Sequence, residues 1–235
     1  PVANVAVTFA VAAGGGTVSL VQPVLTDVNG IATTSWTLGT IVGPNTLTAT
    51  AGTLAGSPVT FTATGTSALP SSIAITAGDG QTAIVGTAVA TPPAVIVRDQ
   101  FNNPVAGVAV TFAVESGAGT VDPATPVTTD ASGIAAATSW TLGNTAGSNT
   151  LSASVDGLTG SPVTFSASGT AGAATQVALQ AGDGQTATVA TAVTIAPAGI
   201  VRRPFKNPGA GGGGKFAAAA VGRSAAGGSH SLLRA

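Results

Sequence analysis

The sequence predicts an all-β protein made of β-sandwiches in tandem. The chain repeats itself at a spacing of about 100 residues, since residues 37–98 align with residues 141–202 and match them at more than half of the positions. A repeat of that length has the size of a domain, whereas solenoids and propellers repeat every 20 to 50 residues or so. Val and Thr are frequent, and these β-branched residues favour strands. Only 6% of the residues are charged.

Alternating apolar residues between turn signals predict the strands of the complete repeat. One strand places Val108, Val110, Phe112 and Val114 on one face, another Val163, Phe165 and Ala167, and a third Leu151, Ala153 and Val155; Ile134, Ala136, Thr138, Trp140 and Leu142 share the face of a fourth. Ile73 with Ile75, residues 94–98 and a segment near Val121 or Val127 complete the set. Seven strands in about 100 residues predict tandem seven-stranded immunoglobulin-like β-sandwiches.

The two copies differ by one residue ahead of the tryptophan strand. The second copy has the extra residue between Ile134 and Trp140, so that in the first copy Ile31 is out of phase with Trp36 and Leu38. Because a slip by one residue turns every side chain to the other face, we expect a β-bulge there in one of the copies.

The repeat also predicts the domain boundaries. Residues 1–68 form a partial repeat that lacks its first strands, and residues 69–170 form a complete one. Residues 171–205 supply the opening strands of a third, incomplete repeat. Residues 206–235 are an irregular Gly/Ala-rich basic tail that we expect to be disordered.

Within the tail, "PGAGGGGKF" at residues 208–216 resembles the sequence motif of a phosphate-binding loop. Phe216 stands where that motif needs a Ser or Thr hydroxyl, and the stretch aligns with the strand "PVAGVAVTF" that begins at residue 104, with valines replaced by glycine. Burial of a valine is worth roughly 1.5 to 3 kcal/mol, so these losses predict that the strand fails to form. The valine-to-glycine pattern favours a reading error or a decaying gene end over a functional motif.

Charge is divided unevenly along the chain. All eight acidic residues lie in residues 1–201 together with Arg98, whereas every other basic residue and the single histidine, His230, lie in residues 202–235. A basic tail can bind nucleic acid. Since its composition is explained by the altered strand, we expect no nucleic-acid partner.

The complete repeat resembles the bacterial immunoglobulin-like domains of group 1, which recur in invasin- and intimin-type surface proteins. The matching signature is "VRDQFNNPVAGVAVTF" at residues 97–112, followed by "TTDASGIAAATSWTLG" at residues 128–143. The first copy carries "PVANVAVTF" and "LTDVNGIATTSWTLG". The resemblance covers roughly residues 1–205 and implies a spacer or adhesin stalk at the bacterial cell surface or in a secreted protein.

Two alternatives remain beside the spacer, namely a module that binds a glycan or host protein, with calcium as a possible aid, and an accessory spacer of an extracellular enzyme. Head-to-tail pairing of two chains, in which residues 171–202 complete residues 1–66, is a further idea. The expected partners are the neighbouring repeats and a host or cell-surface protein or glycan.

No signal peptide is visible, and no apolar stretch suits membrane insertion.

The residues that could carry chemistry are few. Asp99, Asp130 and Asp27 are weak calcium candidates, because Asp and Asn in turns more often bond their own backbone. Trp36 and Trp140 could stack on a sugar, but each shares a face with a leucine and is interpreted as core. No histidine or carboxylate pair has a plausible catalytic partner, so we expect neither an enzyme nor a cofactor.

Overall fold

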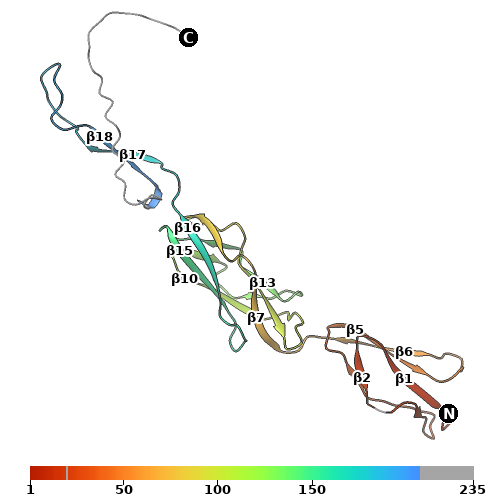
Figure 1. Ribbon diagram of the computed structural model, residues 1–235. Coiled ribbons are helices and arrows are strands. Elements are labelled where there is room, and N and C mark those ends of the chain that lie inside the picture. The colour runs from red at the N-terminus through yellow and green to blue at the C-terminus, as the bar shows by residue number, and fades with distance from the viewer. Residues whose placement is uncertain (20, 207–235) are drawn as a thin grey trace, which may run out of the picture.

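The computed structural model describes residues 1–19 and 21–206 of the chain. Figure 1 shows three groups of strands that follow one another along one axis. We call them the N-terminal strand group (residues 6–65), the middle strand group (residues 70–170) and the C-terminal strand pair (residues 176–202). In the described residues no helix is long and apolar enough to cross a membrane.

The middle strand group is a β-sandwich. Its strands are β7 (Pro70–Ala77), β8 (Gln81–Ile84), β9 (Ala94–Asp99), β10 (Ala109–Ser116), β11 (Thr120–Asp122), β12 (Val127–Thr128), β13 (Ile134–Ala136), β14 (Ser139–Thr141), β15 (Gly147–Ser154) and β16 (Val163–Thr170). One sheet has the order β12-β10-β15-β16-β8, and β13-β9-β7 and β11-β14 form the others. All pairings are antiparallel except β16 with β8.

Alternation along the strands builds one core between these sheets, as the sequence predicts. Val110 and Phe112 on β10 and Phe165 on β16 are at most 4% exposed, and Trp140 is fully buried. The remaining core residues are Ile73, Val89, Val95, Val97, Val105, Ala135, Ala137, Leu142, Leu151, Ala153 and Ala167. The all-β sandwich and the core assignment of Trp140 are therefore confirmed.

The number of strands differs from the prediction. The structure has ten strands between residues 70 and 170, all of which it describes, where the alternation predicts seven. β11 and β12 are separate strands, the strand over 134–142 is divided into β13 and β14, and β8 is additional. The sequence of β8, QTAI, has too few apolar residues to show a strand period.

The predicted common face of Ile134, Ala136 and Trp140 is wrong. Ala135 and Ala137 point into the core at 1% and 3% exposure, so the inward phase shifts by one residue before Trp140. The shift occurs where the chain leaves β9, the partner of β13, and joins β11, the partner of β14. The extra residue of the second copy is thus absorbed where the chain changes sheets, and the expected β-bulge is replaced by this crossover.

The N-terminal strand group repeats the same pairing. Its strands are β1 (Ala6–Ala13), β2 (Gly16–Val18), β3 (Val24–Leu25), β4 (Trp36–Leu38), β5 (Gly43–Thr50) and β6 (Val59–Gly65), with sheet orders β3-β1-β5-β6 and β2-β4. β1 and β5 show the register shift that β10 and β15 show at the corresponding place. Phe61 on β6 is 45% exposed, whereas its counterpart Phe165 is fully buried, because β7, β8 and β9 cover that face only in the middle group.

The C-terminal strand pair consists of β17 (Gln176–Ala181) and β18 (Ala198–Arg202) and is followed by the 3-10 turn η1 (Pro204–Lys206). β17 and β18 pair as β7 and β9 do, with a register shift at the equivalent position. Apolar side chains of this pair face solvent, among them Val177 at 77% and Leu179 at 66% exposure. The predictions for the phosphate-loop imitation and, apart from Lys206, for the basic tail lie outside the described residues.

Candidate functional site

In two acidic turns of the T-D-x-x-G type, the aspartate accepts hydrogen bonds from the backbone of its own turn. One Asp130 oxygen accepts the N–H groups of Ser132 at 2.8 Å and Ile134 at 3.0 Å. One Asp27 oxygen accepts the N–H groups of Asn29 and Ile31, at 2.9 Å each. The hydrogen bond from the Ile31 N–H lowers the pKa of Asp27, and the hydrogen bonds from Asn29 lower it further. Together they outweigh desolvation, which would raise this pKa. Both carboxylates therefore serve first as turn formers.

A third acidic turn fastens β8 to its neighbour. Asp79 accepts hydrogen bonds from the backbone N–H of Ser166 at 2.8 Å, from its hydroxyl at 3.0 Å and from the N–H of Gly80 at 2.8 Å. These bonds, the Ser166 N–H foremost, lower the pKa of Asp79. The residue stabilises the parallel pairing of β8 with β16.

The D-x-x-x-N turn at the end of β9 is built differently, because its first and last residues, Asp99 and Asn103, are buried. We call residues 99–103 the junction turn. Asp99 is 4% exposed and accepts the N–H groups of Phe101 at 2.9 Å and Asn103 at 2.8 Å through one oxygen, and that of Ala68 at 2.9 Å through the other. Ala68 lies in the connection between β6 and β7, so the carboxylate also holds the chain that enters the middle strand group.

The electrostatics of Asp99 favour its charged form. Burial of the carboxylate would raise its pKa, but hydrogen bonds from the Asn103 side chain and from the N–H groups of Ala68, Asn103 and Phe101 together lower the pKa to about 2. Asp99 is therefore ionised at neutral pH and orients the Asn103 amide, whose nitrogen lies 3.2 Å and 3.0 Å from the two carboxylate oxygens.

Asn103 connects two strand groups. Its side-chain nitrogen donates to the carbonyl of Thr40 at 2.7 Å, and its side-chain oxygen accepts the N–H of Val42 at 3.1 Å. We call residues 39–43, which join β4 to β5, the junction loop. The Asn103 amide thus donates to one backbone group and accepts from another in a segment more than 60 residues away. The backbone of a neighbouring strand would make the same pair of hydrogen bonds.

The junction loop is itself held by a buried asparagine. Asn45, at 1% exposure, accepts the N–H of Gly39 at 3.3 Å and donates to the carbonyl of Gly43 at 3.1 Å, and so ties both ends of the loop together. Gly14 packs so closely on Asn45 that a Cβ at residue 14 would collide with it. The middle strand group repeats this arrangement, with Asn149 binding Gly143 at 3.1 Å and Gly147 at 3.2 Å.

The calcium candidates do not come together. Asp27, Asp99 and Asp130 lie in three separate turns, and the described residues contain no group of three or more acidic or histidine side chains that could hold a metal ion. Calcium binding stays a prediction. The contact of Asn103 with the junction loop could not be expected from the sequence, because it is made to backbone atoms, which leave no signal there.

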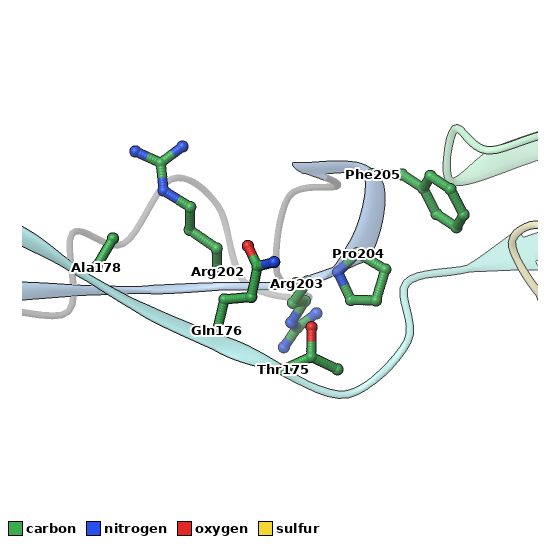
Figure 2. Close-up of a pocket in the computed structure, with 7 residues that line it drawn as sticks. All are labelled: Thr175, Gln176, Ala178, Arg202, Arg203, Pro204 and Phe205. Atoms are coloured by element: carbon green, nitrogen blue, oxygen red, sulfur yellow. The ribbon is translucent and has the colours of Figure 1, made fainter.

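A hollow lies between β17, β18 and η1, lined by Thr175, Gln176, Ala178, Arg202, Arg203, Pro204 and Phe205. In Figure 2 the Phe205 ring points toward the strands of the middle group, away from Arg202. Two of its ring atoms lie 3.1 Å and 3.2 Å from the place where a Cβ of Gly86 would stand. The described residues of the lining carry guanidinium groups and no carboxylate, so they form no acid–base pair.

With this geometry established, the chain can be compared with known proteins. Residues 86–168 match the family described as bacterial Ig-like domain (group 1). This segment, about a third of the chain, is similar to a bacterial Ig-like domain of group 1. It coincides with most of the middle strand group, and it contains the junction turn, the core tryptophan and Asn149.

Solved structures extend the likeness along the chain. The Escherichia coli adhesin FdeC aligns with a TM-score of 0.57 at 19% identity, over 90% of this chain and 67% of that chain. Yersinia pseudotuberculosis InvD aligns at 15% identity over 86% and 60% (TM-score 0.49), and the D0-D1 domain of intimin at 24% over 70% and 79% (TM-score 0.32). At these identities the similarity to FdeC establishes the fold alone. No curated protein sequence matches the chain.

Proposed function

We propose that this chain is a structural module of a bacterial cell-surface or secreted protein and acts as a spacer or adhesin stalk. The observation that carries the proposal is the end-to-end order of the strand groups (Figure 1). The junction turn of the middle group contacts the junction loop of the group before it. An Ig-like domain joined to its neighbour in this way adds length. The similarity in fold to FdeC, described as an adhesin, supports a place at the cell surface.

The acidic turns favour a scaffold over a binding surface. Both carboxylate oxygens of Asp99 and of Asp27 already accept hydrogen bonds from the protein, and so does one oxygen of Asp79 and of Asp130. Trp140, the tryptophan of the middle group, is fully buried and offers no platform to a sugar. A spacer needs only its fold and its length, and the buried polar contacts described above serve both.

A display experiment separates a spacer from a ligand-binding module. The chain is inserted between a cell-surface anchor and a small binding tip, and cells are tested on the tip's ligand beneath a polymer layer. We expect the inserted chain to restore attachment at least several-fold over the tip joined directly to the anchor, because the tip reaches further. A compact globular insert of similar mass is the control.

The same chain without the tip is then tested on glycan arrays and on host-cell surface proteins, with and without calcium. A spacer shows no saturable binding in either condition. Saturable binding by the chain alone, or attachment no better than with the globular insert, would contradict the proposal and favour a binding module.

A further inference from the structure

We propose that the junction turn is a docking site for the junction loop of the preceding Ig-like unit, and that it holds two consecutive units in a fixed relative orientation. The inference deepens the proposed function, because a fixed orientation matters to a protein that works through its length. The partner is defined by its chemistry: a bent backbone segment that presents a carbonyl and an N–H two residues apart, as Thr40 and Val42 do.

The junction turn is held in its conformation by hydrogen bonds within the turn itself. Asp99 accepts hydrogen bonds from Asn103 through both the backbone N–H and the side-chain amide, all within a turn that is buried at both residues. Asn102 adopts a φ of 70°, in the left-handed region that asparagine tolerates better than most residues. The Asn103 amide is thus fixed in one orientation, so that little rotamer entropy is lost when it binds.

The junction loop is likewise held in its conformation by hydrogen bonds of its own unit. Asn45 ties Gly39 to Gly43, and the loop between them offers Thr40 and Val42 to the junction turn. Since the side chains of these two residues are not the groups that are bound, any unit that folds its loop in this way is a suitable partner. Charge complementarity is not needed, which fits a protein with 6% charged residues.

The middle strand group carries both halves, the turn near its start and the loop further along the chain. The middle strand group presents the junction turn toward the N-terminal group, and its own loop over residues 143–147 is held by Asn149 as the first loop is held by Asn45. The arrangement is therefore head-to-tail and can be repeated along an array. In the third copy the residue equivalent to Asp99 is Arg203, which cannot accept a hydrogen bond, so that copy lacks the carboxylate that orients the turn.

Pulsed electron paramagnetic resonance on the full chain tests this docking. The chain has no cysteine, so spin labels can be placed at Thr60→Cys on β6 and Thr164→Cys on β16, equivalent exposed positions in the two groups. We expect a narrow distance distribution in the parent chain. Asn103→Ala removes both bonds from one side and should broaden the distribution at least two-fold.

Val42→Pro is the second variant, because it removes the N–H donor without touching the middle strand group. Thr40→Ala is the matched control, since it changes the side chain and keeps the carbonyl that is bound. Hydrogen exchange of β10 and β15 shows that the middle group remains folded in each variant.

Broadening by Asn103→Ala and Val42→Pro, with Thr40→Ala like the parent, supports the docking site. An unchanged distribution in the two variants, or equal broadening by Thr40→Ala, overturns it. Ligand binding by the chain alone would contradict the spacer function and leave these distances unaffected, so the two proposals fail separately.

Discussion

Trp140→Ala is expected to lower the free energy of unfolding of the middle strand group by about 3 to 5 kcal/mol. Trp140 is fully buried, and its removal leaves a cavity among the side chains of β9, β10, β15 and β16 that the sheets cannot close. A domain of this size is stable by only about 5 to 15 kcal/mol, so the variant should stand near the limit of folding. Urea unfolding followed by hydrogen exchange of β15 and β16 measures the loss.

Two matched variants test the physical reason. Trp36→Ala removes the equivalent residue of the N-terminal group, where the indole is only partly buried, and should cost clearly less. Trp140→Phe should also cost less than Trp140→Ala, because it keeps an aromatic ring and removes an indole N–H that is buried without a partner in the described residues. Equal losses in all three variants would contradict the assignment of Trp140 to the centre of the core.

Gly143→Ala is expected to destabilise the middle strand group by about 1 to 3 kcal/mol or more, although it adds a single methyl group. A Cβ at residue 143 would collide with the carbonyl oxygen of Gly117, and both belong to backbone that cannot turn aside. Asn149 binds the N–H of Gly143, so the shift would also disturb the loop over residues 143–147. Thermal unfolding followed by circular dichroism gives the change.

Gly107→Ala serves as the control for the loss of a glycine. Gly107 has a φ of 81° and open space where its Cβ would stand, so the substitution costs only the strain of a left-handed backbone, about 1 to 2 kcal/mol. A Gly143→Ala protein as stable as the parent would show that the two loops can separate, and would contradict the close backbone packing at this end of the sandwich.

The sequence predicts the faces of the strands better than their partners. Alternation places Val110, Phe112 and Phe165 correctly in the core, because burial selects side chains and burial has a period of two in a strand. It does not reveal that the chain changes sheets between β13 and β14, since a strand that moves from one partner to another keeps apolar residues on its inner side. The one-residue change of phase at Trp140 follows from that move.

The junction could not be predicted for a related reason. The turn residues Asp99 and Asn103 are visible in the repeat, and their types favour a turn. Their contacts with Ala68, Thr40 and Val42 are made to backbone atoms, which every residue carries. A sequence shows which side chains are available for such contacts and gives no sign of the backbone that they meet.

Small-angle X-ray scattering tests the central claim, that the chain is an extended array. A version that ends at Lys206 restricts the measurement to the described part of the chain. A compact protein of that length has a radius of gyration of about 17 Å. Three strand groups in line, with strands of eight residues at about 3.3 Å per residue, predict a radius of about 25 to 30 Å. A value near 17 Å would contradict the spacer account.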